Sequence, residues 1–319
     1  MPLPATAGRR RDLKSLTVVI GNVNYIRAHA LNHRQFKGLL QELDANYGDV
    51  LYFSAVRWLS RGRTLKRFFE LKDELAMFLG MKGQPVGHFS DSQWLDDLAF
   101  LVDITEKLNA LNVSMQGRGK LVHNLYGCIQ SFENKLELWE SQLRAGRLDH
   151  FTALQGQHGE DETVFDGERY ATEVARLKKE FEKRFQDFCK HKVSFEIFAM
   201  PFSFDPLQAP TDLQEELIEL KSDIDIKAQF LEKELQEFYR GLPRQTFPNL
   251  IKHAQKLFSM FGSTYLCEQF FSKLKYSKNK NRNALSDMHL EDTLRVASSH
   301  LVPDINSILG EQKQYQVSH

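Results

Sequence analysis

The sequence has few cysteines and no long apolar run. Its three cysteines, Cys128, Cys189 and Cys267, form no Cys-x-x-Cys pair. A disulfide framework and a structural zinc site are therefore not expected, and a reducing compartment fits best. No stretch of about 18 apolar residues occurs, so a membrane span is not expected. The apolar run 16–20 near the start is too short for the core of a signal peptide.

An excess of charge of one sign is also lacking. Lys plus Arg number 42, and Asp plus Glu number 42. A free-standing nucleic-acid binder usually shows a basic excess, so any DNA contact must come from a local patch. The 42% hydrophobic content and the 24 Phe suffice for a sizeable core and argue against a disordered chain.

The common signatures of enzymes are missing as well. Neither Ser60 nor Ser272 lies in a Gly-x-Ser-x-Gly elbow. The histidines show no metal-ligand spacing, and no phosphate-binding or dinucleotide-binding glycine pattern occurs. We therefore expect no cofactor, no bound metal and no small-molecule substrate.

Helical periodicity is what the sequence has in abundance. Three prolines between residues 201 and 210 break it, the glycines and acids of 156–167 indicate an exposed loop, and Ser90 or Asp91 can cap a helix. The only candidate strand is 50–53. The apolar spacing predicts helices over residues 11–30, 36–43, 65–75, 91–115, 121–143, 168–198, 211–224 and 248–275, and a last one after Ser286.

Two segments carry a resemblance to a known family. Residues 49–62 run from Asp-Val-Leu-Tyr to Val-Arg-Trp-Leu-Ser-Arg-Gly. Residues 263–272 read Ser-Thr-Tyr-Leu-Cys-Glu-Gln-Phe-Phe-Ser and precede a basic stretch and a Leu-containing helix. The first resembles the Arg-Trp motif of hAT-superfamily transposases, and the second is similar to their C-terminal dimerisation region. The resemblance covers roughly residues 22–300 and extends to vertebrate transposon-derived proteins with general transcription factor II-I repeats or BED-type zinc fingers.

The resemblance implies a mainly α fold. It would be the multi-helix insertion domain of a hAT transposase, with incomplete remnants of a ribonuclease-H-like core at both ends. The implied organisation is a divergent N-terminal segment, a core remnant with the Arg-Trp motif, the helical insertion domain and the dimerisation region, at residues 1–21, 22–63, 64–262 and 263–319.

The same resemblance bears on catalysis. Active family members hold divalent metal with two Asp and one Glu, and Glu268 matches the Glu. Trp58 matches a Trp associated with the flipped DNA end, although a packing role is favoured here. Both Asp residues should precede residue 22, yet residues 1–21 contain only Asp12, and the Cys-x-x-His motif is missing. One carboxylate cannot hold a metal pair, so we expect Glu268 and Trp58 to be vestigial and the chain to lack nuclease or transposase activity.

Two groups of basic residues are candidates for contact with nucleic acid. Basic side chains beside an aromatic ring can bind phosphates and stack on a base, and a basic run can also direct nuclear import. The alternative interpretation of the second group is a solvated loop between helices. The candidates are Arg57, Trp58 and Arg61 in the first group, and Lys273, Lys275, Lys278, Lys280 and Arg282 in the second.

The C-terminal segment also contains many large apolar residues within a short stretch. Leaving their apolar surface in water costs a free energy of about 25 cal/mol per Å². We therefore expect self-association, or association with a related transposase-derived protein, through this segment. The candidate dimerisation residues are Tyr265, Leu266, Phe270, Phe271, Leu274, Leu290 and Leu294.

The interpretation that these features favour is a catalytically inactive, nuclear, transcription-related association module. One alternative is a non-catalytic DNA-binding module. Another is a transposase subunit that supplies Glu268 to a partner holding the two Asp residues. A translated pseudogene with no selected role is a further alternative.

Overall fold

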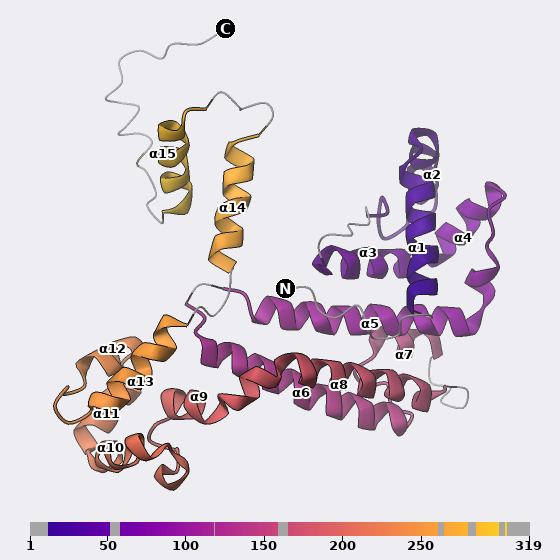
Figure 1. Cartoon of the computed structure of the whole chain (residues 1–319). Coiled ribbons are helices and arrows are strands. Elements are labelled where there is room, and N and C mark those ends of the chain that lie inside the picture. The colour runs from indigo at the N-terminus through magenta and orange to yellow at the C-terminus, as the bar shows by residue number, and fades with distance from the viewer. Residues whose placement is uncertain are drawn as a thin grey trace. The chain divides into compact units, whose positions relative to one another are not determined.

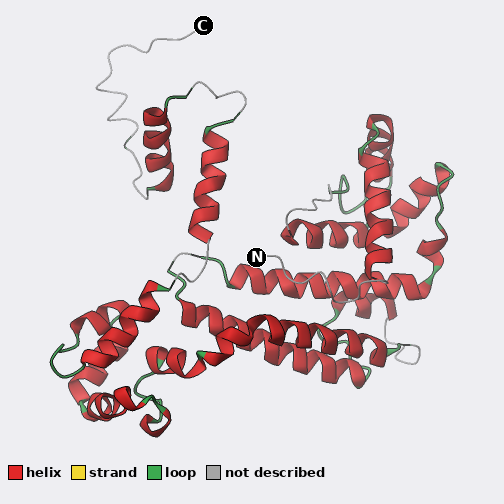
Figure 2. Cartoon of the chain, in the orientation of Figure 1, coloured by secondary structure: helices red, strands yellow, loops and turns green. Residues whose placement is uncertain are grey.

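A computed structural model describes residues 12–51, 58–117, 119–158, 165–260, 265–279 and 285–299, together with Asp304. Within these residues the chain is built of helices and connections, without a strand (Figure 2). The mainly α fold is thereby confirmed. None of the described helices is long and apolar enough to cross a membrane.

The α-helices follow one another through the whole described chain (Figure 1). They are α1 (Asp12–Arg27), α2 (Ala30–Glu42), α3 (Trp58–Glu70), α4 (Lys72–Met81), α5 (Ser92–Ser114), α6 (Val122–Arg144), α7 (Thr152–His158), α8 (Gly167–Lys190), α9 (Lys192–Ala199), α10 (Thr211–Ser222), α11 (Ile224–Glu232), α12 (Leu235–Gly241), α13 (Pro248–Ser259), α14 (Tyr265–Ser277) and α15 (Asp287–Ser298).

The chain divides into two compact units. The first, here called the helical unit, comprises residues 1–116 and 120–262, and the second comprises residues 117–119 and 263–319. In the described part of the helical unit, α1 to α5 surround one apolar cluster that contains Phe36 and Phe68. The helices α5 to α8 surround a second cluster around Phe132 and Phe181, and α9 to α13 surround a third around Phe198.

Several helix ends lie where the sequence places them. The Asp91 carboxylate accepts hydrogen bonds from the amides of Gln93 at 3.0 Å and Trp94 at 3.3 Å, which confirms it as the cap of α5. The Ser286 hydroxyl accepts from the His289 amide at 3.3 Å and begins α15. These side chains satisfy amides that have no partner inside the helix.

Other boundaries correct the predictions. A single helix over 168–198 is wrong, because α8 and α9 are separated at His191. Phe181 packs in the second cluster whereas Phe198 packs in the third, so the break redirects the apolar face from one core to the next.

Four further predictions differ from the structure. The helix expected over 65–75 is interrupted at Leu71, which is buried between α3 and α4. The helix expected over 248–275 ends at Ser259, and α14 begins at Tyr265. The start of the expected loop 156–167 is the end of α7. Of the candidate strand, Val50 and Leu51 are not in a strand, and the rest lies outside the described residues.

The segment expected to be a ribonuclease-H-like remnant consists, where it is described, of parts of α1 and α3, the whole of α2, and non-helical connections. Residues of α1, α2 and α3 contribute Val23, Phe36 and Leu65 to the first cluster, which also contains Leu75 of α4 and Leu98 of α5. The assignment of 22–63 to such a core therefore remains a prediction.

Two buried carboxylates join helices that are distant in sequence. Asp103 of α5, which is 2% exposed, accepts hydrogen bonds from the amides of Ala153 and Leu154, both at 3.1 Å, at the start of α7. Glu216 of α10, which is 8% exposed, accepts from the amides of Asn249 at 2.9 Å and Leu250 at 2.8 Å, at the start of α13. Each negative charge thus meets the positive end of a helix.

Candidate dimerisation and nucleic-acid sites

The predicted dimerisation residues lie on α14 and α15, here called the C-terminal helix pair. The two helices pack on each other (Figure 1). Leu294 is buried between them at 7% exposure, and Leu274 and Leu290 are half-buried. The Lys273 ammonium donates a hydrogen bond to the carbonyl of Ala297 and ties the end of α15 to α14.

The C-terminal helix pair leaves large apolar side chains uncovered within its unit. Phe270 is 43% exposed and Phe271 is 63% exposed, and their ring centroids lie 6.4 Å apart. Tyr276, Met288 and Val296 are 82%, 68% and 65% exposed. Exposed aromatic and aliphatic groups of this size are typical of association surfaces.

The predicted dimerisation residues thus fall into three groups. Phe270 and Phe271 are exposed, and Leu274, Leu290 and Leu294 contribute to the packing within the pair. The side chains of Tyr265 and Leu266 lie outside the described residues.

The basic run is partly used inside the C-terminal helix pair. Besides the bond from Lys273, the Lys278 ammonium lies 3.3 Å from the Asp287 carboxylate. Lys275 is exposed on α14. Lys280 and Arg282 lie outside the described residues. Two of the three described lysines therefore have partners within the pair.

The start of the Arg-Trp segment is held by a cluster of charged groups. The Asp49 carboxylate accepts hydrogen bonds from Arg27 of α1 and from the Nε2 of His33 of α2, both at 2.8 Å. Arg67 of α3 donates to the Asp49 carbonyl at 3.1 Å. The carboxylate therefore anchors the chain before α3 to both preceding helices.

The remaining residues of the Arg-Trp segment are only partly described. Trp58 and Arg61 lie in the first turn of α3, and their side chains are outside the described residues. The whole of Arg57 is outside them as well. Sequence reasoning missed Arg27 and His33, because their distances of 22 and 16 residues from Asp49 correspond to no local motif.

The candidate vestigial carboxylate, Glu268, lies on α14. Its side chain is outside the described residues. Elsewhere in the described chain, no three His, Cys, Asp or Glu side chains lie close enough to hold a metal ion.

A further site was missed from the sequence. A groove with a volume of about 730 Å³ lies between α5 and α6. Its basic or potentially basic lining residues are Lys107, Lys120, His123, Lys135 and His150. They come from two helices and two loops, so no spacing in the sequence reveals that they meet.

Comparison with known families gives two matches. Residues 12–144 match the FAM200/GTF2IRD2 helical domain, which spans α1 to α6. Residues 214–297 match the hAT family C-terminal dimerisation region, which includes the C-terminal helix pair except its last residue. The expected resemblance to hAT transposase-derived proteins is thereby confirmed.

The chain is also similar to curated relatives. General transcription factor II-I repeat domain-containing protein 2 of Bos taurus is 39% identical over 283 residues, which cover 89% of this chain and 29% of the relative. The Mus musculus protein of the same name is 38% identical over 265 residues, which cover 83% of this chain and 28% of the relative. The chain thus spans less than a third of the length of these relatives. No solved structure matches it.

Proposed function

Because this chain carries the hAT family C-terminal dimerisation region and is similar to transposase-derived proteins, we propose that it is a non-catalytic dimerisation module that acts in the nucleus. The observation that carries the proposal is the exposed apolar surface of the C-terminal helix pair. Phe270, Phe271 and Val296 lie within the matched region and are uncovered in their own unit.

A second copy of the chain is the partner that this surface fits best. Most soluble oligomers are symmetric homodimers, in which the same patch on both subunits forms the interface. Aromatic anchors near the centre of such an interface carry most of its binding free energy. Phe270 and Phe271 are the described residues that can serve as these anchors.

Light scattering coupled to size-exclusion chromatography tests the proposal over a range of concentrations. We expect a dimer for the unaltered chain and a dimer weakened by about 100-fold or more for the double variant Phe270→Asp/Phe271→Asp. Met77→Asp is the matched control, because Met77 is 46% exposed on α4 of the helical unit. A monomeric unaltered chain, or equal dissociation of the control, would contradict the proposal.

The non-catalytic part has its own test. The names of the relatives describe proteins that contain general transcription factor II-I repeats. We expect purified chain to leave DNA intact in the presence of Mg²⁺ or Mn²⁺. Strand cleavage that Glu268→Gln abolishes would overturn this part and favour a catalytic subunit.

The nuclear and transcription-related part rests on the same names. It predicts that a fluorescently tagged chain collects in the nucleus and co-purifies there with itself or with a related transposase-derived protein. A tagged chain that stays outside the nucleus would remove this part and leave the dimerisation proposal intact.

A further inference from the structure

The groove between α5 and α6 combines an apolar floor with a basic rim. Leu111 of α5, and Phe132 and Trp139 of α6, form the floor and are 5%, 4% and 7% exposed. The edge includes Leu138, which is 46% exposed. An apolar side chain from outside can therefore reach a surface that is already largely free of water.

The rim is positive. No Asp or Glu is among the described residues that line the groove, whereas Lys107, Lys120 and Lys135 are. Burial lowers the pKa of the His123 imidazole below its ordinary value, so this ring is neutral near pH 7. The lysines supply positive charge to the groove at neutral pH, and His123 does not.

The three lysines differ in their surroundings. The Lys107 ammonium donates a hydrogen bond to the carbonyl of His150 and lies 4.6 Å from the centroid of the Trp139 ring. Burial also lowers the pKa of Lys107. Lys120 and Lys135 are exposed and can turn toward an incoming anion.

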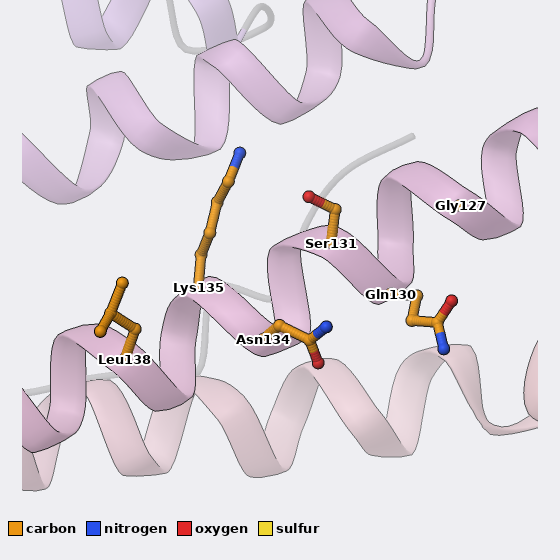
Figure 3. Close-up of a pocket in the computed structure, with 6 residues that line it drawn as sticks. All are labelled: Gly127, Gln130, Ser131, Asn134, Lys135 and Leu138. Atoms are coloured by element: carbon orange, nitrogen blue, oxygen red, sulfur yellow. The ribbon is translucent and has the colours of Figure 1, made fainter.

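The lining of the groove includes the small residues Gly127 and Ser131. A hollow of about 390 Å³ on the face of α6 extends the groove and shares Gly127, Ser131, Lys135 and Leu138 with it. Figure 3 shows that Ser131, Lys135 and Leu138 extend from the same side of α6. Small residues let the backbone of a partner approach closely, and the longer side chains of Lys135 and Leu138 then flank it.

We propose that this groove binds an amphipathic helix with an acidic face, supplied by a partner protein. The apolar face of such a helix would cover Leu138 and the floor, and its carboxylates would pair with Lys120 and Lys135. A nucleic acid fits less well, because Trp139, at 7% exposure, offers little ring surface on which a base could stack. The proposal concerns the helical unit and does not depend on dimerisation by the C-terminal helix pair.

A suitable probe is a synthetic peptide with the sequence of residues 211–234 of this chain. It contains eight acidic and three basic residues, and its apolar residues recur at helical spacing within α10 and again within α11, which are separated at Asp223. Binding of the fluorescently labelled peptide to the whole chain is measured by anisotropy at about 0.15 M salt, where non-specific ion pairing is screened. A scrambled peptide of equal composition and a short DNA duplex are the comparison ligands.

We expect the double variant Lys120→Glu/Lys135→Glu to bind the peptide about tenfold or more weakly, and Leu138→Ser to weaken binding severalfold. The charge control is Lys183→Glu, at an exposed lysine on α8. The apolar control is Met77→Ser, since Met77 and Leu138 are both 46% exposed. Both controls should bind like the unaltered chain, and circular dichroism verifies that all variants fold.

Three outcomes would overturn the proposal. They are failure of the peptide to bind at about 100 μM, equal binding of the scrambled peptide or the duplex, and equal loss in the control variants. None of them involves the oligomeric state, so a failure here and a failure of the dimerisation proposal are distinguishable.

Discussion

The helical unit and the C-terminal helix pair use apolar residues in opposite ways. In the helical unit, rings such as Phe181 and Phe198 are at most 1% exposed and lie in continuous clusters. In the C-terminal helix pair, Phe271 is 63% exposed, and Leu294, at 7% exposure, is the one large apolar side chain that is buried among those described there. Two short helices bury little apolar area between them, so among the described residues of the pair the large apolar side chains are mostly exposed.

The largest expected effect comes from replacing a Phe by Ala in each of the two regions. Phe181→Ala should lower the free energy of unfolding of the helical unit by about 3–5 kcal/mol, because it opens a cavity in the second cluster. Phe271→Ala should lower the free energy of unfolding of the C-terminal helix pair by less than about 0.5 kcal/mol. Urea unfolding followed by tryptophan fluorescence measures the first variant, since Trp94 and Trp139 lie in the helical unit, and hydrogen exchange of α14 and α15 measures the second. Similar losses in the two variants would refute the distinction.

A smaller effect on stability is expected from removing the side chains that cap the first amides of α13 in the helical unit and of α15 in the C-terminal helix pair. Glu216→Ala leaves two amides of α13 without an acceptor in a buried site and should cost about 1–3 kcal/mol. Glu216→Gln keeps one acceptor oxygen and should cost less. Ser286→Ala removes an exposed cap from α15 and should cost about 1 kcal/mol.

Hydrogen exchange at the first amides of each helix would report these losses. Faster exchange of Asn249 and Leu250 is expected in Glu216→Ala, and faster exchange of His289 in Ser286→Ala. If Glu216→Ala left the exchange of α13 unchanged, the carboxylate would not be the cap that the geometry indicates.

The smallest predicted effect concerns pH. Burial raises the pKa of Asp103 above its ordinary value of 3.8, although the hydrogen bonds from its two amide partners partly oppose this. The folded state therefore holds a proton on Asp103 more tightly than the unfolded state. The contribution of this proton to the free energy of unfolding is fully present below pH 3.8 and is lost as the pH rises through the raised pKa. Relative to Asp103→Asn, the unaltered chain should gain stability between about pH 7 and pH 4.

Asp187→Asn provides the control of opposite sign. The Lys190 ammonium, 2.8 Å away, lowers the pKa of the exposed Asp187 carboxyl. The stability linked to this carboxyl is present above the unfolded pKa and is lost as the pH falls through the lowered value. Urea unfolding at both pH values compares the variants. A trend of the same sign in both would contradict the burial of Asp103.

Sequence reasoning predicted those features of the fold and the sites that depend on neighbouring residues. The helical period, the cap at Asp91, the last helix after Ser286 and the apolar character of 263–300 all follow from local spacing. It could not predict the break at His191, because α8 and α9 serve two different cores and the sequence does not state how many cores there are.

By itself, the sequence determined that the chain is helical and which family its C-terminal region resembles, since helical period and motif order are properties of neighbouring residues. Only the tertiary structure decided that Asp103 and Glu216 cap distant helices, that Lys273 and Lys278 serve the C-terminal helix pair, and that lysines of α5 and α6 share a groove. These pairings depend on which helices pack together, and packing joins residues whose separation along the chain carries no periodic signal.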